Sequence, residues 1–137
     1  MRALVQSLGV RGIRFAGFVD QDELPAYYAA ADVFVFPTLA DTYGIVLLEA
    51  AASGLALVTS IYAGASLDFV KDGEGGLMVD PHDEHALAEQ IAKLADCPKL
   101  VRNLGTDAYN VARLRTPDRT AEQYVSAIVT AVAGKKL

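Results

Sequence analysis

The feature that most constrains this chain is a strand–helix–strand pattern between residues 33 and 59. Val33–Phe36 is a continuous β-branched and aromatic run, which is typical of a strand buried on both faces of a parallel sheet. A polar loop and an apolar helix ending at Gly54 follow, and Ala56–Thr59 is expected to form a second short strand. Parallel strands joined through a helix form a βαβ unit. Because ligands bind at the carboxyl ends of the strands in open parallel sheets, we expect a binding site in the polar loop.

The loop before the helix has the properties of an anion site. A helix that begins near Gly44 or Ile45 presents free backbone N–H groups and the positive end of its dipole. Because Gly44 has no side chain, a phosphate or a sugar can approach the backbone closely. Asp41 precedes the helix, and its carboxylate oxygens can accept hydrogen bonds from two neighbouring hydroxyl groups.

Glu49 is the unusual residue of the helix, because the residues around it are Ile, Val, Leu and Ala. Such a carboxylate is rarely left unpaired, and it could bind ribose hydroxyls or a structural partner. Two acids around an anion site suggest a ligand with hydroxyls at both ends and a phosphate between them, as in a sugar nucleotide. Each residue alone also has an ordinary explanation: Asp41 as a solvated loop residue or helix cap, Gly44 as a turn residue, and Glu49 as a solvent-facing position.

Composition excludes several classes of function. The chain has 137 residues, 53% of them hydrophobic, which is enough for one domain with its own core. Its net charge of −5 argues against nucleic acid or an anionic membrane surface as a partner. We find no apolar run long enough for a transmembrane segment and no signal peptide. The single cysteine, Cys97, favours a reducing, cytoplasmic setting. His82 and His85 are interpreted as a solvated helix start, because a metal needs more than two convergent ligands.

The rest of the chain continues the alternation of strands and helices. Further strands are expected at Ile13–Phe15, with a possible extension to Ala16, and at Leu77–Val79. In the first half of the chain, helices are expected over Arg2–Leu8, closed by Gly9, from Asp20 or Gln21 to Ala31, and over Leu67–Val70, capped by Ser66. Three further helices are expected to begin after Pro81–Asp83, at Pro98 and after Thr116. This order predicts an α/β fold with a small parallel sheet covered by helices on both faces. Four strands are few for such a sheet, which indicates that a first part is missing.

The segment Asp41–Gly54 resembles the Glu-x7-Glu signature of the group 1 glycosyltransferases, which are retaining enzymes of the GT-B class. Four other segments resemble segments of that family, in the family's order: Arg14–Val19, Leu24–Pro37, Gly64–Asp68 and Asp72–Pro81. The resemblance runs from about residue 8 to 95, and loosely through the last helices. It implies that residues 1–137 form a single partial nucleotide-sugar-binding domain. That domain would be the Rossmann-like C-terminal half of a GT-B fold, lacking its first βα units.

The same resemblance implies roles for particular residues. Asp41 and Glu49 are the candidate catalytic acids: Asp41 would hold the hydroxyls of the donor sugar, and Glu49 would bind the ribose of the donor nucleotide. The helix-start turn would meet the sugar and the diphosphate through its backbone, and an earlier loop would lie near the nucleobase. These donor-binding residues are Tyr43, Gly44 and Ile45 in the turn, and Phe18 and Val19 in the loop. No metal or other cofactor is implied.

The sequence also departs from the family's pattern. Asp41 stands where the family usually has Glu, so its carboxylate reaches one methylene less far. Ala65 replaces a common second glycine, and Asp68 replaces Glu. Family members have an N-terminal acceptor domain and a basic pair that faces the diphosphate, and we find neither: no lysine or arginine lies between Arg14 and Lys71. We therefore interpret the chain as a fragment that is not catalytically competent alone.

The predicted function is the donor-binding part of a glycosyltransferase that moves a sugar from a nucleotide sugar to a hydroxyl acceptor with retention. A glycosidase-type acid pair is disfavoured, because Glu49 lies too deep along the helix to flank the same bond. Two alternatives stay open: a non-catalytic module that binds a nucleotide or a partner chain, and a sugar-nucleotide epimerase of similar fold, whose motifs we do not find after Gly64. An exposed edge of the strand at Ile13–Ala16 would favour association, so a homodimer is also predicted.

Overall fold

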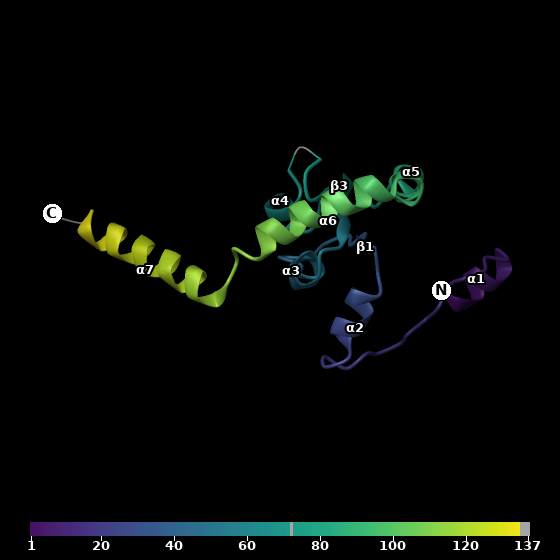
Figure 1. Cartoon of the computed structure of the whole chain (residues 1–137), viewed down its shortest axis with the longest axis horizontal. Coiled ribbons are helices and arrows are strands. Elements are labelled where there is room, and N and C mark those ends of the chain that lie inside the picture. Colours follow the sequence, from purple (N-terminus) through teal and green to yellow (C-terminus); the bar gives the residue numbers. More distant parts are fainter. Residues whose placement is uncertain (72, 135–137) are drawn as a thin grey trace.

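A computed structural model describes residues 1–71 and 73–134 of the chain. Three parallel strands form one sheet in the order β1-β2-β3, and the elements follow one another along the chain as Figure 1 shows. The strands are β1 (Val33–Phe36), β2 (Ala56–Ser60) and β3 (Gly76–Val79). The helices are α1 (Arg2–Ser7), α2 (Leu24–Ala29), α3 (Ile45–Ala52), α4 (Ser66–Phe69), α5 (Glu84–Ala95), α6 (Pro98–Ala112) and α7 (Pro117–Ala133).

The middle strand, β2, is buried along its whole length. It pairs with β1 from Val33 opposite Ala56 to Phe36 opposite Thr59, and its other edge pairs with β3. The loops that follow the strands therefore leave the sheet at its carboxyl end, which is the end where ligands bind in sheets of this kind. The predicted strand–helix–strand unit is confirmed.

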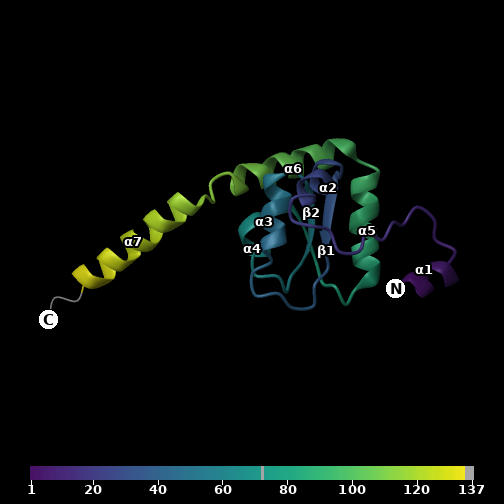
Figure 2. The same cartoon turned by 90° about the horizontal axis from the view of Figure 1, so that it is seen from below.

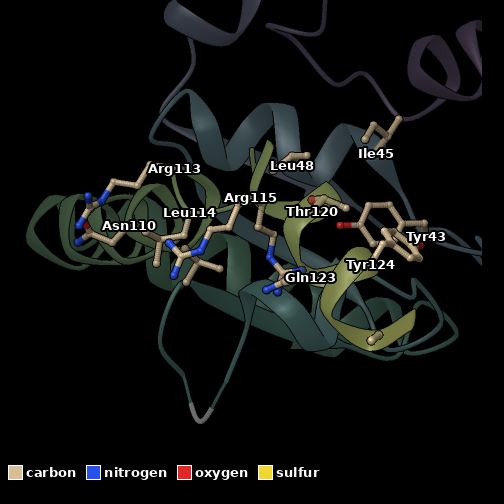
Figure 3. A pocket seen from close by; sticks show the side chains of 13 residues that line it. Tyr43, Ile45, Leu48, Asn110, Arg113, Leu114, Arg115, Thr120, Gln123 and Tyr124 are labelled. Carbon is tan, nitrogen blue, oxygen red and sulfur yellow. The ribbon is translucent and has the colours of Figure 1, made fainter. Parts of the chain in front are cut away.

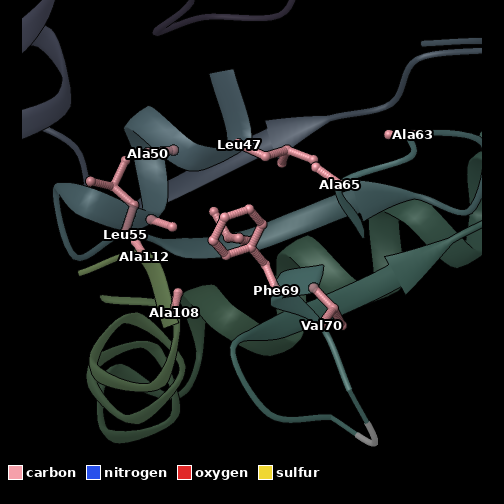
Figure 4. Close-up of a cluster of buried hydrophobic side chains, with 11 residues drawn as sticks. Leu47, Ala50, Leu55, Ala63, Ala65, Phe69, Val70, Ala108 and Ala112 are labelled. Atoms are coloured by element: carbon pink, nitrogen blue, oxygen red, sulfur yellow. The ribbon is translucent and has the colours of Figure 1, made fainter. Parts of the chain in front are cut away.

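Helices cover both faces of the sheet. Figure 2 shows α3 and α4 on one side, α5 on the other, and α6 across one end. A core cluster on the first side joins the buried faces of α3, β2 and α6 around Leu47, Leu57 and Phe69 (Figure 4). The second cluster contains Val58 and Leu94 and lies between the sheet, α5 and the first part of α6. The predicted α/β class with a small, doubly covered sheet is confirmed.

The strand predicted at Ile13–Phe15 is absent, so the described residues form three strands instead of four. Ile13 is 49% exposed and Phe15 is 37% exposed, and the ring of Phe15 lies 4.9 Å from the guanidinium of Arg2 in α1. Arg14, which was expected on this strand, is also exposed. A β-branched or aromatic run becomes a strand only where a neighbouring strand can accept its hydrogen bonds, and here the segment packs beside α1 instead.

Two other expectations for the sheet and its flanks need correction. The residues of Val33–Phe36 are half-buried, because β1 has a neighbouring strand on one side only among the described residues. The exposed edge predicted for residues 13–16 therefore belongs to β1. The helix expected from Asp20 or Gln21 begins only at Leu24, after a turn in which Glu23 N–H donates to the Asp20 carbonyl at 2.9 Å.

Ser66 does not cap α4 as predicted. It is the first residue of that helix, and Ala65 is the N-cap. The buried Ser66 hydroxyl donates to the carbonyl of Ser60 at 2.7 Å and lies 2.8 Å from the hydroxyl of Thr59. A buried hydroxyl needs hydrogen-bond partners, and those of Ser66 connect α4 to the carboxyl end of β2.

The helix ends read from the sequence are largely confirmed. Gly9, at a φ of 64°, follows α1, and Val10 N–H donates to the Val5 carbonyl at 3.2 Å. Asp83 caps α5 by accepting from Ala86 N–H at 2.9 Å, and Thr116 caps α7 by accepting from Arg119 N–H at 3.3 Å.

The last helix, α7, contributes no buried residue and extends away from the sheet (Figures 1 and 2). Its apolar stripe is exposed along its length: Tyr124, Val125, Ile128, Val129 and Val132. Among the described residues, no helix is both long enough and apolar enough to cross a membrane.

Candidate functional site

The loop that follows β1 is joined to the loop that follows β2 by backbone hydrogen bonds. Asp41 N–H donates to the Tyr62 carbonyl at 3.2 Å, and Gly64 N–H donates to the Asp41 carbonyl at 3.2 Å. Ala65 N–H donates to the Tyr43 carbonyl at 2.7 Å. The two loops therefore form one structure at the carboxyl end of the sheet, and they hold Asp41 beside the start of α3.

Two glycines make this junction possible. Gly64 packs directly on the backbone of the first loop, where a Cβ would overlap the carbonyl of Thr42. Gly44 is the N-cap of α3 and has a φ of 85°, a left-handed conformation that favours glycine. A Cβ on Gly44 would also lie 3.2 Å from the ring of Phe36. The glycine at 44 thus turns the chain into α3, and it is itself buried against Phe36 and Leu47.

Asp41 is half-buried and lines a hollow of about 530 Å³ with Ala40, Thr42 and Tyr62. Its Oδ1 accepts a hydrogen bond from Tyr43 N–H at 3.0 Å. Among residues 1–71 and 73–134, no group donates a hydrogen bond to Oδ2 of Asp41. One oxygen of this carboxylate therefore orients the side chain, and the other can accept a ligand hydroxyl.

Glu49 has a partner within the protein. The hydroxyl of Tyr28, on α2, donates to Glu49 Oε2 at 2.9 Å. Burial of the phenol, followed by the hydrogen bond and the negative charge of Glu49, raises the pKa of Tyr28 to about 12. Glu49 therefore has a structural partner, which was one of the two roles expected for it. Its other carboxylate oxygen, Oε1, takes no part in this hydrogen bond.

The predicted donor-binding residues are not all brought together. Tyr43 and Ile45 line a pocket of about 1190 Å³, which is separate from the hollow beside Asp41. Glu49 lines neither space. Phe18 is 92% exposed and Val19 is half-buried; both belong to the irregular segment before α2, and neither lines either space.

The larger pocket lies between the first turns of α3, the end of α6 and the beginning of α7 (Figure 3). Three arginines line it together with Tyr43 and Ile45, namely Arg113, Arg115 and Arg119. These cations were not among the predicted site residues, because they lie far from the acidic loop along the chain. The available signal was the spacing of three arginines within seven residues around the start of the last helix.

Arg115 is held in place by the fold. Its two terminal nitrogens lie 3.0 and 3.1 Å from the two carboxylate oxygens of Asp68, in a bidentate pair. Its guanidinium also lies 5.6 Å from the centre of the Phe69 ring. Arg113 donates from Nε to Asn110 Oδ1 at 3.2 Å. Asp68, one of the departures from the family's pattern, therefore joins α4 to the loop before α7.

Possible metal ligands are scattered over the part of the chain that the structure describes. No three side chains of His, Cys, Asp or Glu gather there as metal ligands. His85 instead lies 3.4 Å from Glu89 on the exposed surface of α5, and the ring of His82 packs edge-on against Tyr62. Cys97 is exposed.

Comparison with known sequences gives a family assignment. Residues 1–111 match the family model described as glycosyl transferases group 1. A D-inositol 3-phosphate glycosyltransferase of Corynebacterium glutamicum is 35% identical over 137 residues, which cover 99% of this chain and 32% of the relative. The chain thus spans about one third of the length of that curated relative.

Solved structures agree in fold. A sucrose-phosphate synthase from Thermosynechococcus elongatus is 29% identical with a TM-score of 0.83, over 98% of this chain and 34% of that protein. The C-terminal domain of a group 1 family glycosyl transferase from Francisella tularensis is 28% identical with a TM-score of 0.75, over 83% and 59%. The Anabaena protein HepE, in complex with UDP-glucose, has a TM-score of 0.78 at 23% identity, over 95% and 35%. These likenesses confirm the fold class expected of the C-terminal half of a GT-B enzyme.

Proposed function

The chain belongs to the group 1 glycosyltransferases, and from this membership we propose that it forms the donor-binding part of a sugar-transferring enzyme. In the proposed reaction, a sugar moves from a nucleotide sugar to a hydroxyl acceptor with retention of the anomeric configuration. The observation that carries the proposal is the junction of the two loops, which holds Asp41, with an oxygen available, beside the start of α3. Residues 1–137 would form a single partial nucleotide-sugar-binding domain.

Asp41 and the start of α3 would bind the sugar and the diphosphate. The available oxygen of Asp41 accepts a hydrogen bond from a hydroxyl of the donor sugar. The backbone of Tyr43, Gly44 and Ile45 faces the sugar and the diphosphate, because the first turn of a helix has N–H groups without intrahelical partners. This arrangement is supported by the left-handed Gly44, which leaves the turn without a side chain.

Glu49 would bind the ribose with Oε1 while Tyr28 holds Oε2. The phenol then acts as a positioning residue, because it limits the rotation of the carboxylate. Phe18 and Val19 would lie near the nucleobase, although neither residue lines the spaces beside Tyr43 and Asp41 in this structure. Positive groups near the diphosphate would stabilise the charge that develops as the nucleoside diphosphate leaves.

The isolated chain is proposed to bind a donor without turning it over, because the acceptor must be held by other parts of the protein. A cytoplasmic location and a homodimer are part of the same proposal. The alternative is a non-catalytic nucleotide-binding or partner-binding module. It is favoured by the shorter acid at position 41, whose carboxylate reaches less far than that of a glutamate.

Calorimetry with UDP and a UDP-sugar tests the assignment of the two acids. Glu49→Gln should weaken the binding of both ligands by about tenfold, because a charge-assisted hydrogen bond to the ribose is lost. Asp41→Asn should weaken only the UDP-sugar. Glu89→Gln, an exposed change on α5, is the matched control and should leave both affinities unchanged. Unaltered UDP affinity in the Glu49 variant would contradict the assignment.

Incubation with a longer protein that includes the acceptor-binding part tests the reaction itself. Release of nucleoside diphosphate together with a glycosylated acceptor supports transfer. Recovery of an epimerised donor would instead support the epimerase alternative, and binding without either product would support the non-catalytic module.

A further inference from the structure

We propose that the pocket between α3, α6 and α7 is an anion site for phosphate groups, with Arg113 and Arg119 as its principal charges. Only one part of this proposal rests on the proposed function, namely that a nucleotide-sugar donor could supply the phosphate. The chemistry of the pocket itself is independent of the two acids, because neither Asp41 nor Glu49 lines it.

The charge of the pocket is opposite to that of the chain. The whole chain has 12 lysines and arginines against 17 acids, but the residues that line the pocket include three arginines and no carboxylate. Among residues 1–71 and 73–134, only Arg115 of these three forms an ion pair, with Asp68. Arg113 bonds only the neutral side chain of Asn110. The charges of Arg113 and Arg119 are therefore uncompensated in the described structure.

The position of the pocket adds a second source of positive potential. Tyr43 and Ile45, at the beginning of the eight-residue helix α3, form part of its wall. The first turn of a helix has unpaired N–H groups and the positive end of the dipole, which favour anions. Arginines and a helix start thus border the same space, although they lie far apart along the chain (Figure 3).

The other groups on the wall suit the same kind of ligand. Thr120, Gln123 and Tyr124 bring hydroxyl and amide donors from the first turns of α7. Arginine guanidinium groups bind phosphate oxygens in a planar, two-pronged geometry. The volume of about 1190 Å³ exceeds the needs of an inorganic phosphate, so the pocket has room for the organic part of a phosphorylated ligand.

Titration calorimetry of the 137-residue chain with inorganic pyrophosphate tests the site directly. The double variant Arg113→Gln/Arg119→Gln should bind pyrophosphate at least tenfold more weakly, since two charge-assisted contacts are removed. Arg102→Gln changes an exposed arginine on α6 that does not line the pocket, and it should stay within about twofold of the unaltered chain.

A charge-retaining variant separates binding from folding. Arg113→Lys/Arg119→Lys keeps both charges without the guanidinium geometry, so it should bind pyrophosphate between the unaltered chain and the glutamine variant. Circular dichroism should be the same for all variants, because both arginines are exposed. The proposal is overturned if the unaltered chain does not bind pyrophosphate, if the glutamine variant binds it equally well, or if Arg102→Gln loses as much affinity.

Competition experiments distinguish the two sources of phosphate. If the donor supplies it, UDP displaces pyrophosphate, and the glutamine variant loses affinity for UDP as well. If a separate phosphorylated molecule supplies it, glucose 6-phosphate displaces pyrophosphate while UDP still binds. Arginine-dependent pyrophosphate binding without any UDP-sugar binding would keep the anion site and refute the donor assignment. Glu49-dependent binding of UDP by a chain that does not bind pyrophosphate would refute the anion site and keep the donor assignment.

Discussion

At the scale of single residues, Asp41 and Glu49 differ in what holds them. Asp41 is oriented by a backbone N–H within its own loop, two residues away. Glu49 is oriented by a phenol from a helix 21 positions earlier in the chain. The position of Asp41 therefore depends on local turn geometry, whereas that of Glu49 depends on the packing of α2 against α3.

The Tyr28–Glu49 pair should make stability depend on alkaline pH. The pKa of Tyr28 is about 12 in the folded protein and about 10 in an unfolded chain, so the folded state holds the phenol proton more tightly. The contribution of this proton is complete below about pH 10, and it is lost as the pH rises from 10 to 12. Urea denaturation of the unaltered chain and Tyr28→Phe should therefore show a stability difference that is constant below pH 10 and shrinks above it.

Tyr124→Phe is the matched control for this experiment, since Tyr124 is exposed on α7. Its difference from the unaltered chain should not change with pH. A Tyr28→Phe difference that stays constant up to pH 12 would show that the phenol proton is not held by the fold.

Gly64→Ala should disrupt the junction of the two loops. A methyl group there would overlap the Thr42 carbonyl, so the loops must separate, at a cost of about 1–3 kcal/mol in the free energy of unfolding. Gly134→Ala, at a helix end with an ordinary φ of −73°, should change stability by less than about 0.5 kcal/mol. Chemical denaturation measures both, and equal effects would argue against the tight contact.

At the scale of elements, two helix caps differ in whether the helix they cap contributes to the buried core. Asp83 caps α5, which places Leu94 in the core, whereas Thr116 caps α7, which has no buried residue. Asp83→Ala should therefore lower the free energy of unfolding by about 1 kcal/mol. Thr116→Ala should reduce helicity in α7 but leave the unfolding midpoint nearly unchanged. Denaturation followed by circular dichroism distinguishes the two, and a matching loss in both variants would mean that α7 is part of the cooperative core.

Local signals predicted most elements well. The helix starts at Asp83, Pro98 and Thr116–Pro117 were confirmed, because caps and prolines act on their own neighbours in the chain. The strand at Ile13–Phe15 was wrong, because a strand also needs a partner that no local pattern reveals.

The candidate site shows the same difference between features set by local sequence and features set by distant contacts. The loop containing Asp41 and the turn at Gly44 were found at the carboxyl end of the sheet, as the alternation of strands and helices predicts. The arginines at the end of α6 and the start of α7 were missed, because their place beside Ile45 depends on how α6 crosses the sheet. The partner of Glu49 was missed for a similar reason, since Tyr28 lies on another helix, 21 positions earlier in the chain.

At the scale of the whole molecule, two surfaces favour association. The edge of β1 has no neighbouring strand among the described residues, and α7 exposes a stripe of apolar side chains. We expect the chain to form dimers or larger species as its concentration rises. Light scattering should show this, and a monomer at every concentration would contradict it.

Changes in α7 identify which surface is responsible. Val125→Glu/Ile128→Glu places two charges on the exposed apolar stripe and should shift the chain toward the monomer. Thr130→Glu adds a charge on the opposite side of the same helix and should leave association unchanged. Association that survives the double variant would point to the β1 edge.

The junction of the two loops also offers a way to detect a ligand without an assay of catalysis. Gly64 and Ala65 donate their N–H groups to the carbonyls of Asp41 and Tyr43, so these amide hydrogens can exchange with deuterium only when the loops separate. A ligand held by Asp41 would keep the loops together and slow that exchange. Two amides that need not touch the ligand would then report its presence, even in a chain that performs no turnover.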